Sequence, residues 1–120
     1  MIHHVSLEVA DLDRSIAFYD SVLRPLGWRR HIDTDERSAW GIVRPIFYIV
    51  ERRDPRIGGG HVCFAANGIS AVKAAWEGGI TAGGATQGDP GQRPEYGPTY
   101  YSAYLRDLDG HRIEIAVGID

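Results

Sequence analysis

The chain has 120 residues, which is the size of one ordinary domain and leaves no room for two independent ones. Apolar residues make up 43% and charged residues 24%, as in globular proteins and unlike disordered chains or coiled coils. The formal net charge of −3 argues against a nucleic-acid partner, because phosphate-binding domains usually carry a net basic face. The single cysteine, Cys63, excludes an internal disulfide. With no secretory start and no apolar run of roughly 20 residues to span a membrane, we expect a cytoplasmic protein.

The first half of the chain predicts a strand, a helix and three further strands. Residues 3–9 alternate between polar and apolar side chains, which predicts a half-buried strand. Asp11 is expected to cap a helix whose apolar residues recur at helical spacing until Pro25 and Gly27 end it. The three strands that follow are expected at about 28–33, 38–43 and 45–51.

The second half repeats this order. Residues 60–66 predict a strand, Asn67 is expected to cap a helix, and the Gly78–Gly79 pair is expected to end it. Asp107 and Asp109 are expected to cap backbone N–H groups in a turn, with Gly110 at positive φ and His111 exposed to solvent. The remaining segments are expected to form a weak strand over 80–86, a loop over 87–98, and strands over about 99–106 and 111–117.

The two halves also align with each other. An offset of 57 residues superimposes several matching positions: His4 on His61, Val5 on Val62, Leu7 on Phe64, Tyr19 on Trp76 and Gly27 on Gly84. We therefore predict an α+β fold in which one domain contains two βαβββ modules, the first over about 1–57 and the second over about 58–120.

Three side chains of this pattern are candidate metal ligands. His4 and His61 hold equivalent places, each on the strand face opposite the apolar residues, and Glu114 lies opposite the core residues of the last strand. Two imidazoles and a carboxylate suit Fe(II), Mn(II), Ni(II) or Zn(II) and leave positions open for substrate. A lone strand histidine is more often a hydrogen-bonded structural residue, and a glutamate on a polar face is usually just solvated. Two histidines at one repeat position favour the metal site.

Three runs of the sequence together resemble the vicinal oxygen chelate superfamily, which includes glyoxalase I, extradiol dioxygenases, fosfomycin resistance enzymes and bleomycin-binding proteins. The runs are His4-Val5 to Leu26-Gly27, Gly59-Gly60-His61-Val62-Cys63-Phe64, and Asp107-Leu108-Asp109-Gly110-His111-Arg112-Ile113-Glu114. The resemblance implies that the paired modules form an open half-barrel around a cleft. It also implies that His4, His61 and Glu114 bind a divalent metal, and that the chain forms a homodimer.

The sequence departs from this family at one position. Glyoxalase I-like members take a further ligand, commonly Glu, from the last strand of the first module. Here the register places Tyr48 at that position, and tyrosine is a poor ligand at neutral pH because its pKa is near 10. Glu51 lies three residues further on, at the end of the strand. Lactoylglutathione lyase activity is therefore in doubt. Three ligands are closer to the extradiol dioxygenase pattern, although those enzymes are commonly longer.

The expected function is that of a glyoxalase-like or dioxygenase-like enzyme whose small substrate chelates the metal through two oxygens. Glu8 and Tyr48 are candidate general bases by strand parity alone, and Tyr48 is also a candidate substrate contact. Arg93 and Tyr96 are expected at a rim or lid, where the arginine meets an anionic substrate and the tyrosine stacks on it. Trp40 either lines the cleft or packs in the core. The alternatives are a non-catalytic protein that binds small molecules, as bleomycin resistance proteins do, and a degenerate relative with neither function.

Overall fold

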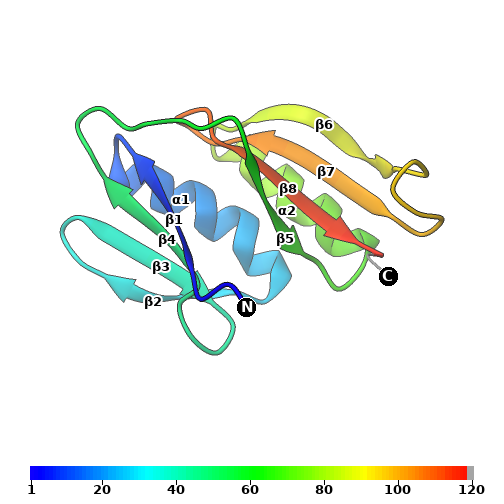
Figure 1. The fold of residues 1–120 in the computed structure, drawn as a ribbon, viewed down its shortest axis with the longest axis horizontal. Helices are drawn as coiled ribbons and strands as arrows, with labels where there is room; N and C mark the ends of the chain where they lie inside the picture. The colour runs from blue at the N-terminus through cyan, green and yellow to red at the C-terminus, as the bar shows by residue number, and fades with distance from the viewer. Residues whose placement is uncertain (119–120) are drawn as a thin grey trace.

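The computed structural model describes residues 1–118, which form two four-stranded sheets and two long helices (Figure 1). The elements, in chain order, are β1 (Val5–Val9), α1 (Leu12–Leu23), the 3-10 helix η1 (Arg24–Leu26), β2 (Arg29–Asp33), β3 (Arg37–Gly41), β4 (Phe47–Glu51), β5 (His61–Ala65), α2 (Ile69–Thr81), β6 (Ala85–Gln92), β7 (Tyr101–Arg106) and β8 (Arg112–Val117). This order confirms the α+β fold with two βαβββ modules. Over the described residues, neither helix is long and apolar enough to cross a membrane.

The two sheets have the same topology, with strand orders β1-β4-β3-β2 and β5-β8-β7-β6. In each sheet the first strand of the module pairs in parallel with the last, so that Ser6 lies opposite Tyr48 and Cys63 lies opposite Glu114. Ser6 and Cys63 are themselves equivalent at the offset of 57 residues. Tyr48 is therefore the structural counterpart of Glu114 in the first module.

Both helices lie behind the sheets in Figure 1 and cover one face of each. They share a single core in which Phe64 of the second module stacks edge-on against Phe47 and Trp28 of the first. Because side chains alternate along a strand, the residues between the core positions face away from the helices. The opposite face of each sheet is therefore the one that carries Ser6, His61 and Cys63, all of which are exposed.

The sheets meet beside β1 and β5, which do not pair with each other, and buried polar contacts join the modules there. The Tyr19 hydroxyl of α1 donates to Asp107 Oδ2 at 2.6 Å. Asp107 Oδ1 accepts the backbone N–H groups of Asp109 and His111 at 3.0 and 2.9 Å. His111 Nε2 lies 2.6 Å from the Glu8 carbonyl oxygen. The expected capping role of Asp107 is confirmed. The expectation that His111 is solvated is wrong, because its ring is buried between the modules.

The segment between β4 and β5 links the two modules, and the predicted boundary at 57/58 falls within it. The last two residues assigned to the second module, 119–120, lie outside the residues that the structure describes.

The helix of the second module differs from its prediction at both ends. Gly68 rather than Asn67 stands at its N-cap, and α2 continues through Gly78 and Gly79 to Thr81. These glycines serve packing instead of ending the helix. A Cβ on Gly78 would lie 2.4 Å from the carbonyl oxygen of Ser21 in α1, so glycine is what allows the two helices to approach this closely.

The strand β6 replaces the weak strand expected over 80–86 and part of the loop expected over 87–98. Its pairing with β7 shifts register twice, between Thr86 and Gly88 and again between Gly88 and Gly91. Such bulges let a segment rich in glycine follow its neighbour. The strand also lies at the edge of its sheet, where Pro90 is tolerated because its missing N–H can face solvent instead of a neighbouring strand.

Candidate functional site

The second module brings His61 and Glu114 together on the face that the helices leave open. His61 opens β5 and Glu114 lies in the neighbouring strand β8. The distance from His61 Nε2 to Glu114 Oε1 is 3.0 Å, and the hydroxyl of Tyr100 donates to Glu114 Oε2 at 2.6 Å. Glu114 is only 3% exposed, whereas His61 reaches solvent. A buried carboxylate with both oxygens engaged therefore lies beneath an accessible imidazole.

The groups around this carboxylate are held in their neutral forms. Desolvation, followed by the charge of Glu114, raises the pKa of Cys63 to about 12 and that of Tyr104 to about 12. Desolvation, followed by the hydrogen bond to Glu114 and then the charge of Glu114, raises the pKa of Tyr100 well above its ordinary value. These side chains remain protonated at neutral pH, so they do not add further negative charge beside Glu114, and Tyr100 donates a hydrogen bond to it.

The raised pKa makes a prediction for Cys63 in the metal-free protein. A thiol whose pKa is raised stays protonated even when the pH reaches the ordinary pKa of a thiol. Few Cys63 thiolates therefore form at pH 8. Iodoacetamide should therefore alkylate Cys63 at least about tenfold more slowly than a free thiol, whose pKa is about 8.5. The rate should rise in Glu114→Gln, which removes the neighbouring charge. Intact-mass spectrometry over time measures both rates, with urea-unfolded protein as the reference. Labelling of the folded protein at the reference rate would contradict the expectation.

The first module carries the counterpart of this pair without its carboxylate. The rings of His4 and Tyr48 stack edge-on, with centroids 5.2 Å apart, where the second module holds His61 and Glu114. Within residues 1–118, no three side chains of His, Cys, Asp or Glu lie close enough to hold a metal ion. A single chain thus brings together two of the three predicted ligands and leaves His4 with Tyr48.

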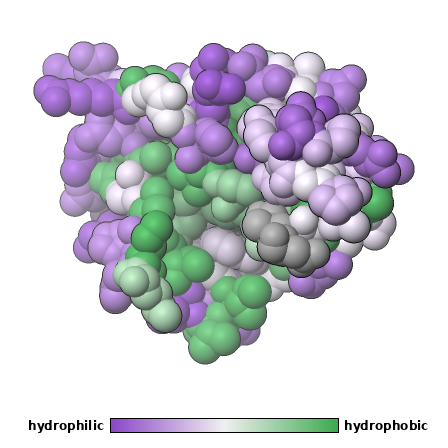
Figure 2. All heavy atoms as spheres, turned by 45° about the vertical axis from the view of Figure 1, so that its right-hand side comes forward, coloured by the Kyte–Doolittle hydropathy of each residue, from purple (hydrophilic) through white to green (hydrophobic). Residues whose placement is uncertain are grey.

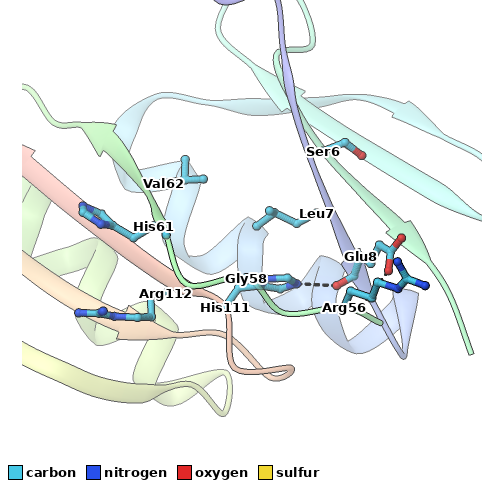
Figure 3. A pocket seen from close by; sticks show the side chains of 10 residues that line it. Ser6, Leu7, Glu8, Arg56, Gly58, His61, Val62, His111 and Arg112 are labelled. Atoms are coloured by element: carbon cyan, nitrogen blue, oxygen red, sulfur yellow. Dashed lines mark hydrogen bonds between the residues drawn. The ribbon is translucent and has the colours of Figure 1, made fainter. Parts of the chain in front are cut away.

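Glu8, predicted from strand parity as a candidate base, shares a cavity of about 440 Å³ with His61. In Figure 3, His61 and Arg112 lie on one side of this cavity, and Glu8 and Arg56 on the other. Glu8 Oε1 accepts the backbone N–H of Arg56 at 2.9 Å. This bond holds the Glu8 carboxylate at the seam between the modules, across the cavity from the His61 imidazole.

Arg93 and Tyr96, predicted as substrate contacts, line a second cavity of about 500 Å³, to which His61 and Arg112 also contribute. Neither Arg112 nor Tyr100 is among the site residues predicted from the sequence. The sequence does contain a signal for Arg112. This residue lies two positions before Glu114 on the same strand, so both side chains point to the same face of the sheet. Tyr100 precedes β7, and only the folded chain shows that its hydroxyl reaches Glu114.

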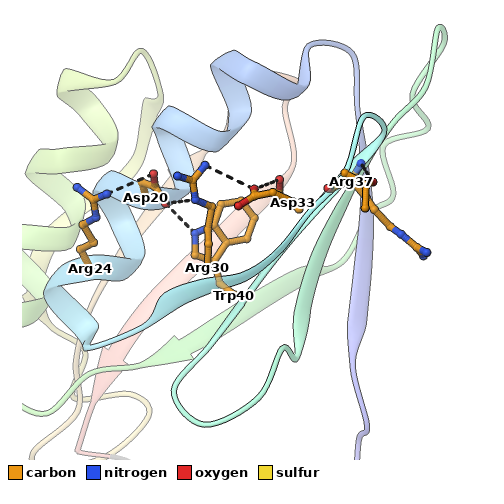
Figure 4. A network of polar contacts seen from close by, with 8 residues as sticks. Asp20, Arg24, Arg30, Asp33, Arg37 and Trp40 are labelled. Carbon is orange, nitrogen blue, oxygen red and sulfur yellow. Dashed lines mark hydrogen bonds and ion pairs between the residues drawn. The ribbon is translucent and has the colours of Figure 1, made fainter.

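Trp40 lies in the core and is 1% exposed. Its indole N–H donates to Asp20 Oδ1 at 2.9 Å, and the same carboxylate forms ion pairs with Arg24 and Arg30 (Figure 4). These contacts fasten α1 to the first sheet. Trp40 therefore has a packing role and does not line either cavity next to His61.

The chain resembles known proteins over almost its whole length. The family model of the glyoxalase/bleomycin resistance protein/dioxygenase superfamily matches residues 1–115. A glyoxalase/bleomycin resistance protein from Albidiferax ferrireducens T118 is 32% identical, with 95% of each chain covered and a TM-score of 0.84.

More distant structures share the fold. A glyoxalase-related enzyme from Fulvimarina pelagi is 20% identical, with 98% of this chain and 88% of that chain covered and a TM-score of 0.77. The fosfomycin resistance protein FosX from Listeria monocytogenes is also 20% identical, with 96% and 90% covered and a TM-score of 0.70. Comparison with curated protein sequences finds no significant match.

Proposed function

Because the chain belongs to the glyoxalase/bleomycin resistance protein/dioxygenase superfamily, we propose that it is a metal-dependent enzyme acting on a small substrate that chelates the metal through oxygen atoms. The observation that carries this proposal is the pairing of an accessible imidazole, His61, with a buried carboxylate, Glu114, beside two cavities. Cavities of a few hundred Å³ suit a small molecule.

The side chains of His4, His61 and Glu114 are of the types that bind a divalent metal. One chain alone does not bring all three together. Imidazole and carboxylate ligands suit Fe, Mn, Ni or Zn. His61 and Glu114 supply two of the three donors, and we propose that His4 comes from a second copy of the chain in a homodimer. Exposed apolar residues support self-association, and Figure 2 shows apolar surface between polar margins on one face. The large apolar side chains that are exposed are Met1, Ile2, Ile42, Val43, Ile57, Ile69 and Tyr96.

The chain's own residues would then position the metal ligands, transfer protons and contact the substrate. A bound metal would stabilise negative charge on the substrate oxygens. Tyr100 holds the Glu114 carboxylate in one orientation through its 2.6 Å hydrogen bond, the usual role of a residue behind a metal ligand. Glu8 faces the cavity of His61 and is the better placed candidate base, because Tyr48 lines neither cavity. Arg93 and Tyr96 are the proposed substrate contacts.

The alternative is a non-catalytic protein that sequesters a small molecule, and one observation favours it. The first module has Tyr48 where the second has Glu114, and no described group of three ligands converges in one chain. A protein that only sequesters a small molecule needs the two cavities and does not need a bound metal.

Metal analysis of the natively purified protein tests the proposal. We expect about one Fe, Mn, Ni or Zn ion per chain, and a stabilisation of about 2.7 kcal/mol when the free metal is at 100 times its Kd. Elemental analysis and a thermal-shift titration measure these. Absence of metal, together with an unchanged melting temperature on adding each ion, would favour the binding protein.

Mixing two inactive variants tests whether two copies share the site. If His4 and His61 come from different chains, His4→Ala and His61→Ala homodimers each lose both sites. A heterodimer of the two variants keeps one intact site, because the remaining His4 and His61 meet there. After unfolding and refolding in an equal mixture, metal binding should return to about a quarter of the wild-type level per chain. No recovery in a mixture shown to contain heterodimers would place the site within one chain.

A further inference from the structure

Two arginines from separate segments face the cavity of about 500 Å³ beside the proposed metal ligands. Arg112 lies at the start of β8, with its Cα paired to that of His61 across the parallel strands. Arg93 comes from the segment that follows β6. Both side chains, together with His61, line the same cavity, so two positive charges border the space next to the His61–Glu114 pair.

The charge of these arginines is not neutralised by the protein. Among residues 1–118, the ion pairs of arginine involve Arg24, Arg30 and Arg52, and neither Arg93 nor Arg112 forms one. Glu95 also lines the cavity but is exposed and pairs with neither. Glu114 is engaged by His61 and Tyr100. The residues that line the cavity therefore carry two arginine charges and one carboxylate charge, in a protein whose overall charge is −3.

Arg93 is also held in place before any ligand arrives. Its Nη2 donates to the carbonyl oxygens of Asp89 and Ser102 at 2.7 and 3.3 Å, and its guanidinium lies 5.9 Å from the centre of the Tyr104 ring. Neutral carbonyls and a ring fix the guanidinium without cancelling its charge. Its Nε is buried and has no partner among the described residues. A guanidinium fixed in this way loses little side-chain entropy when it binds a ligand.

Planar guanidinium groups match the oxygen atoms of carboxylate, phosphonate and phosphate groups, with which they form paired hydrogen bonds. We propose that the cavity between Arg93 and Arg112 binds the anionic group of the substrate, and that the substrate is a small carboxylate, phosphonate or phosphate. This inference rests on the proposed function, because it places the anion beside the proposed metal ligands. It makes Arg112 the residue that selects anionic substrates.

The test uses metal-free full-length protein and measures the binding of acetate, methylphosphonate and inorganic phosphate by NMR titration, with acetamide as a neutral counterpart of acetate. The three anions separate the possible anionic groups. At least one should bind more tightly than acetamide. Arg112→Gln should weaken that binding about tenfold, the loss expected for one charge-assisted hydrogen bond. The side chain of Arg112 is exposed and makes no hydrogen bond to the described residues, so this variant should fold normally.

Two further variants sharpen the result. Arg29→Gln removes the same charge from β2, at the far edge of the other sheet, and should leave anion binding unchanged. Arg93→Lys keeps the charge but loses the fork of the guanidinium, and should weaken binding several-fold. Binding of acetamide as tight as that of all three anions, or an unchanged Kd for the anion in Arg112→Gln, would overturn the inference.

Metal content, measured in parallel on the same variants, separates this inference from the proposed function. Metal binding without an effect of Arg112 on anions would overturn the inference and leave the metal site standing. Anion binding that depends on Arg112, in a protein that takes up no metal, would support the anion site and overturn the metal-dependent function.

Discussion

The His61→Ala variant is expected to bind divalent metal more than about 100-fold more weakly than the unaltered protein, because even residues behind a ligand change metal affinity 10–100-fold. His61 is the accessible donor of its pair with Glu114, and 40% of its side chain is exposed. Its removal should therefore leave the core intact and the melting temperature of the metal-free protein close to that of the parent. Equilibrium dialysis followed by elemental analysis measures the loss of metal, and thermal unfolding checks the fold.

A matched histidine variant shows whether the effect is specific. His31→Ala removes an imidazole from β2 of the first module, where its Nε2 lies 3.1 Å from the Gly41 carbonyl oxygen. This change should leave metal binding as it is. If the metal content of His61→Ala equals that of the parent, the assignment of the ligands is wrong.

The Asp107→Ala variant is expected to lower the free energy of unfolding by about 3 kcal/mol, because it removes charge-assisted hydrogen bonds and leaves buried donors unpaired. Asp107 is 6% exposed and accepts from Tyr19 of the other module and from two backbone N–H groups of its own turn. For a domain of this size the melting temperature should fall by about 10 °C. Urea unfolding followed by tryptophan fluorescence measures the change.

A double-mutant cycle tests the physical reason. Burial, followed by the charge of Asp107, raises the pKa of Tyr19 well above its ordinary value, so its hydroxyl stays a donor throughout the neutral range. Tyr19→Phe removes that donor, and the double variant should lose less stability than the sum of the two single changes. Strict additivity would show that the hydroxyl and the carboxylate do not depend on each other.

Much of the fold follows from local patterns in the sequence. Alternation and helical spacing depend on neighbouring residues, and they predict the elements of the first module closely. The repeat predicts that His4 and His61 are equivalent. The strand register agrees, because β1 pairs with β4 in the same way as β5 pairs with β8. Gly78 and Gly79 mislead because glycine both ends helices and allows them to touch, and only the packed structure separates these uses.

The candidate site is predictable only in part. Strand parity places His61 and Glu114 on one face of one sheet, and the structure brings them within hydrogen-bonding distance. Strand parity does not give the distance between two sheets, and β1 and β5 share no hydrogen bonds that would fix it. The sequence pattern therefore does not determine where His4 lies relative to His61 and Glu114. Tyr100 contacts Glu114 through a non-local approach that no spacing along the chain encodes.

The contact between Gly78 and Ser21 shows how two repeated modules in one chain can differ in sequence. These positions are 57 residues apart, so each is the repeat equivalent of the other, and the two helices touch at a pseudo-twofold axis. In an isologous pair of identical modules, both sides of the axis carry the same residue. Joining the modules in one polypeptide removes that constraint, so one helix can supply the glycine and the other the serine. The same freedom lets one half keep a carboxylate at Glu114 while the other has tyrosine at its counterpart, Tyr48.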